Sequence, residues 1–190
     1  MALTPTTSIP LGFTAPAFNL PDAVSGKMRH SSEFFDKGPT IVVFMCNHCP
    51  YVIHILEELV VFAHEYQSRG LQFVAISSND VITHPQDDVP AMQALGLKHA
   101  FRFPYLFDES QDVAKAYDAA CTPDISAFDA HGKCVYRGQF DGSRPGNETP
   151  VTGSDLRRVA DLLLAGEPVP EEGQIPSIGC NIKWKKDSNN

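Results

Sequence analysis

The amino-acid sequence predicts an α/β fold in which a central mixed β-sheet carries helices on both faces. Two continuous apolar runs, residues 40–46 (TIVVFMC) and 71–78 (LQFVAISS), are typical of strands buried on both faces of a parallel sheet. Between them, apolar residues recur at helical spacing from Val52 to Tyr66, and Arg69-Gly70 closes the helix. The order strand, helix, strand indicates a βαβ unit with a right-handed crossover.

The second half of the chain predicts an antiparallel hairpin and the remaining helices. Residues 125–128 and 134–140 form the two arms of the hairpin, with a turn at residues 130–132. Helical patterns cover residues 89–97, 110–119 with Ser110 as a possible cap, and 154–166 with Gly166 as the stop. Because two parallel strands precede a hairpin, the predicted sheet is mixed.

The length of 190 residues suits one domain, residues 1–190, with short extensions. We expect a loose arm over residues 1–11, a core over 12–166, a Pro/Gly-rich linker over 167–174 and a tail over 175–190. In the tail, apolar side chains alternate with Gly179, Asn181 and Lys183 from Ile178 onward, which predicts an extended segment docked on the body. This docking is expected to bury Trp184, and Cys180 is not assigned to the catalytic set.

Composition narrows the classes of partner and compartment. The net charge of −8 disfavours nucleic acid and anionic membranes. No apolar run approaches the ~20 residues of a membrane span, and the N-terminus does not read as a secretory signal. The five cysteines form an odd, sparse set, which fits a reducing compartment, so a cytoplasmic location is expected. Composition leaves open whether the protein is a monomer or a homodimer.

The stretch CNHCPYV carries the strongest chemical signal, because it places Cys46 and Cys49 where the first strand meets the following helix. Because proline is tolerated in the first turn of a helix, Pro50 predicts a helix that begins at about Asn47. The free N–H groups and the dipole of that helix would favour a thiolate at Cys46, and His48 would add positive charge when protonated. Cys46 is then the attacking thiol, and Cys49, one turn into the helix, resolves the mixed disulfide. A CxxC pair at the end of the first buried strand is the arrangement of a decorated thioredoxin fold.

Two other readings of the cysteine pair stay open. A copper or zinc carrier could use Cys46 and Cys49 with His48 or Cys121, although no second CxxC or HxxxH motif completes a four-ligand site. The two thiols could also be inert core residues. No metal is assigned, and no organic cofactor is implied, because no Gly-rich phosphate-binding motif is present.

The second constellation is ACTPD, residues 120–124. A proline between a helix and a strand predicts a cis Thr122-Pro123 bond opposite the dithiol, with the Thr122 backbone aimed at a substrate chain. The alternative is an ordinary turn proline. Cys121 lies beside this bond and is either a third redox thiol or a packed small side chain.

These motifs together resemble the redoxin branch of the thioredoxin-like superfamily, the AhpC/TSA-type group. GFTAPAFNLPD is similar to the entry segment of that branch. FMCNHCPYV, SSND, ACTPD, YRGQFD and IGCNIKWK resemble a subgroup of probable thiol-disulfide oxidoreductases, from about Pro10 to Lys185. The resemblance implies that Cys46 and Cys49 form a redox dithiol and that Pro123 is a cis-proline.

Departures from related patterns refine this expectation. Thioredoxin itself has Gly-Pro where this chain has Asn47 and His48, and it buries a proton-accepting aspartate where this chain has Thr40. Cys49 would therefore need another base or water. A histidine before the second cysteine resembles the oxidant DsbA. The peroxidase signature T-x-x-C is absent, because Cys46 occupies the threonine position relative to Cys49.

The expected function is thiol-disulfide exchange with protein or small-molecule thiols, together with a reductant or oxidant that the sequence does not identify. A thiol-dependent peroxidase is the alternative, because reactive thiolates also reduce peroxides.

Overall fold

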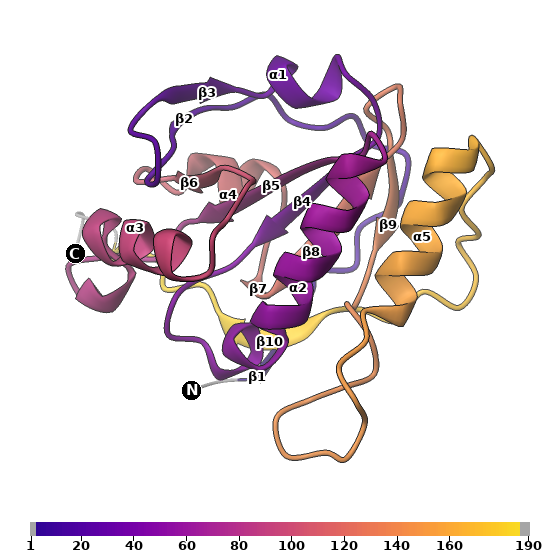
Figure 1. The fold of residues 1–190 in the computed structure, drawn as a ribbon. Helices are drawn as coiled ribbons and strands as arrows, with labels where there is room; N and C mark the ends of the chain where they lie inside the picture. Colours follow the sequence, from indigo (N-terminus) through magenta and orange to yellow (C-terminus); the bar gives the residue numbers. More distant parts are fainter. Residues whose placement is uncertain (1–2, 187–190) are drawn as a thin grey trace.

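The computed structural model describes residues 3–186 and has a five-stranded mixed sheet at its centre (Figure 1). The strand order is β6-β5-β4-β8-β9. The bounds are β4 (Thr40–Phe44), β5 (Gln72–Ser77), β6 (Tyr105–Phe107), β8 (Asp124–Phe128) and β9 (Cys134–Arg137). The pairs β4–β5 and β5–β6 are parallel, whereas β4–β8 and β8–β9 are antiparallel. The predicted α/β class and thioredoxin fold are confirmed.

Helices and extended segments cover both faces of the sheet. Along β4, Ile41 and Val43 face one apolar core, and Val42 and Phe44 face the other, as expected for a strand buried on both sides. The first core contains residues of α2 (Pro50–Ser68), α3 (Val89–Lys98) and α5 (Ser154–Ala165). The second contains residues of α1 (Ser32–Phe35), α4 (Asp112–Ala116) and β2 (Asn19–Pro21), which pairs with β3 (Met28–His30).

The helix α4 is shorter than the predicted 110–119. Gln111 and Asp118 both adopt left-handed backbone conformations, with φ of 67° and 54°, and these bound the helix. Ser110 lies outside it, where its Oγ accepts a hydrogen bond from the amide of Asp112 at 3.2 Å.

Both chain ends join a second, three-stranded sheet in the order β1-β10-β7, with β1 (Leu3–Pro5), β10 (Ile178–Asn181) and β7 (Cys121–Thr122). The predicted docking of the tail is therefore confirmed. Residues 3–5 form a strand rather than part of a loose arm, because β10 offers an edge to which they pair.

The expected burial of Trp184 is wrong, since this side chain is 41% exposed. The alternating pattern holds for Cys180 and Ile182, which are buried, and then ends. Beyond β10, the amides of Lys183 and Lys185 donate to the side chains of Asn79 and Gln111, so the backbone follows these partners rather than a strand.

Helix α2 begins at Pro50, not at Asn47. Cys49 precedes a proline and has extended backbone angles (φ −68°, ψ 121°), in keeping with the steric bias of a residue before proline away from the helical region. Cys49 is consequently the N-cap residue of α2, and Cys46 lies in the turn before it. Among residues 3–186, none of the helices combines the length and apolarity needed to cross a bilayer.

Candidate active site

The two cysteines of the CxxC motif lie together beneath the surface. Cys46 follows β4 and is 1% exposed, whereas Cys49 caps α2 and is 0% exposed. Both are free thiols, and their sulfur atoms are within hydrogen-bonding reach of each other. One proton can therefore be shared between the two sulfurs.

Hydrogen-bond donors gather around Cys49 rather than Cys46. The Cys46 thiol, the Thr122 side chain, the Cys180 thiol and the amide of Val52 together hold the pKa of Cys49 below its usual range, although burial opposes them. The Val52 amide is one of the unpaired N–H groups of the first turn of α2, so the helix terminus acts on its N-cap sulfur. The sequence predicts that the N-terminus of α2 stabilises a thiolate on Cys46. Because α2 begins later than predicted, its N-terminus lies at Cys49 instead.

Cys46 has the opposite electrostatic environment. Its contact with Cys49, its burial and the nearby carboxylate of Asp87 all raise the pKa of Cys46. Of the two thiols, Cys49 is therefore the one that ionises more readily, and Cys46 keeps its proton. When both thiols are protonated, Cys49 donates a hydrogen bond to the carbonyl oxygen of Thr122.

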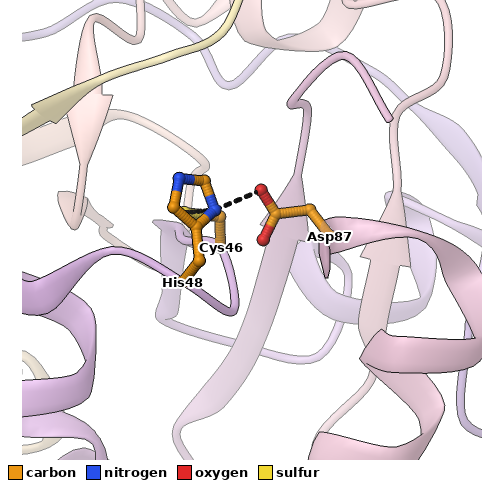
Figure 2. A group of neighbouring side chains, drawn as sticks. All are labelled: Cys46, His48 and Asp87. Carbon is orange, nitrogen blue, oxygen red and sulfur yellow. Dashed lines mark hydrogen bonds and ion pairs between the residues drawn. The ribbon is translucent and has the colours of Figure 1, made fainter. Parts of the chain in front are cut away.

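An ion pair that the sequence analysis did not identify adjoins Cys46 (Figure 2). Nδ1 of His48 lies 2.7 Å from Oδ2 of Asp87 and 3.9 Å from Sγ of Cys46. Because the same ring nitrogen faces both partners, a proton on Nδ1 is donated mainly to the nearer carboxylate.

Asp87 is held rigidly at the end of the 3-10 turn η1 (Pro85–Asp87). Its side chain is 0% exposed and accepts hydrogen bonds from the amide of Asn47 and from Nδ2 of Asn79, both at 2.8 Å. These bonds tie the loop after β5 to the loop after β4. The sequence offers one indication of Asp87, because the segments that follow neighbouring parallel strands meet at one edge of a sheet.

The predicted cis bond between Thr122 and Pro123 is confirmed. Thr122 contacts both cysteines of the C-x-x-C motif: its Oγ1 lies 3.5 Å from Sγ of Cys46, and its carbonyl oxygen accepts a hydrogen bond from Sγ of Cys49 at 3.0 Å. A shallow hollow adjoins Pro123 and is lined by Tyr51, Phe140, Arg144 and other residues. The Thr122-Pro123 segment therefore contacts both cysteines and also borders the surface hollow.

Cys121 points away from the dithiol contacts. Its thiol lies 3.4 Å from the carbonyl oxygen of Pro123, 3.8 Å from the hydroxyl of Thr6 and 3.9 Å from a carboxylate oxygen of Asp124. Burial, followed by the Asp124 charge, raises the pKa of Cys121. These surroundings favour a protonated, packed thiol.

Cys180 does join the site, although the sequence analysis does not place it there. Its side chain is within hydrogen-bonding reach of Cys49, and it is 4% exposed. The period-two pattern of the tail predicts docking but does not indicate which surface the tail covers.

The fold, with two buried cysteines at C-x-x-C spacing, defines a protein of the thioredoxin-fold class. The AhpC/TSA family profile matches residues 11–139, and the chain belongs to this family of redoxin-type thiol oxidoreductases and peroxidases. A comparison with curated proteins finds no match.

Solved structures similar to this chain include two close relatives. An uncharacterized conserved protein from Geobacillus kaustophilus is 48% identical, with a TM-score of 0.96 and 99% of each chain covered. A hypothetical protein from Sinorhizobium meliloti 1021 is 47% identical, with a TM-score of 0.93 and 96% of this chain and 98% of the other covered.

A more distant structure shares the fold. A thiol:disulfide interchange protein of the thioredoxin family from Chlorobium tepidum TLS is 18% identical, with a TM-score of 0.62, covering 83% of this chain and 99% of the other.

Proposed function

We propose that the protein is a thiol-disulfide oxidoreductase that works through the Cys46–Cys49 dithiol. The observation that carries the proposal is the placement of both sulfurs against one residue, since Oγ1 of Thr122 lies 3.5 Å from Sγ of Cys46 and its carbonyl oxygen lies 3.0 Å from Sγ of Cys49. In this account Cys46 and Cys49 are the catalytic thiols, His48 and Asp87 tune Cys46, and Thr122 with Pro123 positions the partner.

The first step is attack by Cys46 on a substrate disulfide. The Cys46 proton passes to the neighbouring Cys49 thiolate, and Cys46 Sγ forms a bond to one substrate sulfur. The substrate S–S bond breaks, and the other substrate sulfur leaves as a thiolate that takes up the proton now on Cys49, which restores the Cys49 thiolate. Cys46 is assigned this role because it shares a turn with His48, whose side chain is 17% exposed. Cys49 is instead fully buried, with Thr122 and Cys180 beside it.

The second step is resolution by Cys49. Its thiolate attacks Cys46 Sγ, the mixed disulfide breaks, and the second substrate thiol is released, leaving a Cys46–Cys49 disulfide. Thioredoxin uses a buried aspartate here, and this chain has Thr40. The N-cap position and the Val52 amide supply an alternative, since they keep the pKa of Cys49 low without a separate base.

The partners proposed are protein or small-molecule thiols and disulfides, with a separate reductant or oxidant that regenerates the dithiol. The hollow beside Pro123 supports this choice, since an aromatic and polar lining offers contacts to a peptide-like substrate. A cytoplasmic location is proposed from the sparse, odd cysteine set.

The test is reduction of a model protein disulfide by the reduced protein, followed by thiol counting. We expect each protein molecule to reduce one disulfide, and Cys46→Ser to slow the reaction strongly, because it removes the attacking thiol. Cys49→Ser should stop at a mixed disulfide with the substrate on Cys46. Cys134→Ser is the matched control, because Cys134 is buried in the second core, where its thiol donates a hydrogen bond to the carbonyl oxygen of Tyr136. Full activity of Cys46→Ser would exclude the proposal.

A thiol-dependent peroxidase is the second candidate. The observation that favours it is the Thr122 hydroxyl 3.5 Å from Cys46 Sγ, since a hydroxyl beside a reactive sulfur can bind a peroxide oxygen. Hydrogen peroxide consumption under a continuous supply of dithiothreitol separates the two. Faster turnover with peroxide than with a disulfide substrate would favour the peroxidase.

Metal binding is the third candidate. Ligand atoms of Cys46, His48 and Asp87 lie within 4.8 Å of one another. Both Asp87 oxygens already accept hydrogen bonds from protein donors, so these contacts would have to be rearranged around an ion. Titration of the reduced protein with zinc or copper(I) tests this: tight uptake of one ion would favour a carrier over an exchange enzyme.

A further inference from the structure

The tail strand β10 places a third thiol against the redox pair. Cys180 lies directly opposite Thr122 in the antiparallel register of β10 and β7. The carbonyl oxygen of Thr122 in turn accepts the thiol hydrogen of Cys49 at 3.0 Å. Cys46, Cys49 and Cys180 belong to the same buried core, and α2 packs against β10 (Figure 1).

The backbone fixes this position closely. A Cβ atom at Gly179 would lie 2.0 Å from the carbonyl oxygen of Thr122, so only glycine fits there. On its other edge β10 pairs with β1, with Leu3 opposite Cys180. The strand is held from both sides, and the sulfur of Cys180 is directed towards Cys49.

The other two cysteines do not share this placement. Cys121 is opposite Asn181, one residue further along, and its sulfur contacts Pro123, Asp124 and Thr6. Cys134 belongs to the second core. Cys49 therefore has two candidate disulfide partners among the described residues, Cys46 in its own loop and Cys180 in the tail.

We propose that Cys180 is a third redox thiol, which takes over the disulfide of the CxxC pair by forming a Cys49–Cys180 disulfide. This inference rests on the proposed function, because it requires the Cys46–Cys49 disulfide as its starting point. It adds a catalytic thiol and a second oxidised form of the same protein.

The step is an internal thiol-disulfide exchange that needs no further oxidant. Cys180 Sγ attacks Cys49 Sγ, the Cys49–Cys180 bond forms and the Cys46–Cys49 bond breaks. Cys46 leaves as a thiolate and takes up the proton that Cys180 releases. The protein stays oxidised by the same two electrons, while Cys46 again becomes a free thiol able to attack a substrate.

The experiment uses the full-length Cys46→Ser protein incubated with oxidised glutathione. Cys49 attacks glutathione disulfide and releases one glutathione, and Cys180 then displaces the second, so two protein thiols are lost without a retained adduct. Peptide mapping should find residues 49 and 180 cross-linked. Adding Cys180→Ser should leave glutathione attached to Cys49, whereas adding Cys134→Ser should leave the 49–180 cross-link intact.

Stable glutathionylation of Cys49 in a natively folded Cys46→Ser protein, with no 49–180 cross-link, would overturn the inference. If circular dichroism shows that this variant is unfolded, the wild-type protein is used to test the inference instead. Acid-quenched wild-type protein from a glutathione buffer should then contain both the 46–49 and the 49–180 disulfides, and a 46–49 disulfide alone would refute the third thiol while leaving the proposed function intact. Absence of both disulfides would instead refute the proposed function.

Discussion

Nδ1 of His48 lies 2.7 Å from a carboxylate oxygen of Asp87, and both residues adjoin the sulfur of Cys46. The histidine comes from the CxxC loop and the aspartate from the turn after β5, so two loops bring an imidazole and a carboxylate to one thiol. When His48 is protonated, the charges of His48 and Asp87 nearly cancel, so the pair has little net electrostatic effect on a thiolate at Cys46. With either partner removed, an unbalanced charge remains beside it.

The His48→Ala variant should make the dithiol more reducing. Without the imidazole, the Asp87 carboxylate is uncompensated, the ionised reduced pair costs more free energy, and the disulfide is favoured. A loss of ~1.4 kcal/mol would lower the reduction potential by about 30 mV for this two-electron couple. Equilibration with glutathione buffers measures the shift, and His64→Ala on α2 is the control. An unchanged potential would mean that His48 does not act on the dithiol.

The Asp87→Asn variant should shift the potential in the opposite direction. The carboxylate is one of the causes that raise the pKa of Cys46, so its neutralisation lowers the free energy of the ionised reduced pair relative to the disulfide. Asp108→Asn is the control, since Asp108 is also fully buried and accepts several hydrogen bonds. Equal shifts of the same sign in the Asp87 and His48 variants would contradict a charge mechanism.

Part of this site follows from local sequence patterns and part does not. The cysteines, the adjacent histidine and the cis-proline come from short motifs whose geometry the βαβ unit dictates. Asp87 is 39 residues from His48 and lies in a loop without regular periodicity, so only the contact of two strand ends brings it to Cys46. The first residue of α2 cannot be predicted from the sequence either, because both Asn47 and Pro50 are compatible with a first helical turn.

The reduced protein should contain a thiolate on Cys49 at pH values below those at which free cysteine ionises, ~8.5. The Cys46 thiol is the largest cause that lowers the pKa of Cys49, so Cys46→Ser should weaken the effect and Cys49→Ser should abolish it. Ultraviolet absorbance of the thiolate, followed during an acid titration, measures this. Absorbance that rises only near the ordinary thiol pKa would contradict the assignment.

The same shift has a consequence for stability. Because the pKa of Cys49 is lower in the folded than in the unfolded state, its ionisation stabilises the fold at pH above the unfolded pKa, and this contribution is lost as the pH falls through the folded pKa. The free energy of unfolding of the reduced wild type, relative to Cys49→Ser, should therefore increase with pH across that window. Urea unfolding at several pH values under reducing conditions tests the sign.

The Gly179→Ala variant should loosen the tail. Its Cβ would meet the carbonyl oxygen of Thr122 at 2.0 Å, and relief requires β10 to move away from β7. Such overpacking costs about 1–3 kcal/mol, so the melting temperature should fall and the buried thiols should be alkylated faster. Gly142→Ala is the matched control, since the nearest atom to its added Cβ lies at 4.0 Å. Equal melting temperatures for the two variants would argue against a tightly held tail.

The tail also shows where sequence patterns stop being informative. Alternation from Ile178 to Ile182 correctly predicts an extended docked segment, because period two is a local property of a strand. The partners of that strand are β1 and β7, which lie at distant points in the chain and are too short to show a pattern of their own. Trp184 continues the alternation in sequence, but the backbone has already left the strand at Asn181.

The most direct measurement of the central claim is a redox titration of the wild-type protein in glutathione buffers, with disulfide mapping at each point. The account predicts one two-electron transition in which Cys49 loses its free thiol and a 46–49 disulfide appears, while Cys134 stays reduced throughout. Cys46→Ser should lack the 46–49 disulfide in every buffer. Free thiols on both Cys46 and Cys49 across the whole range of buffers would contradict the assignment of this pair as an exchange-active dithiol.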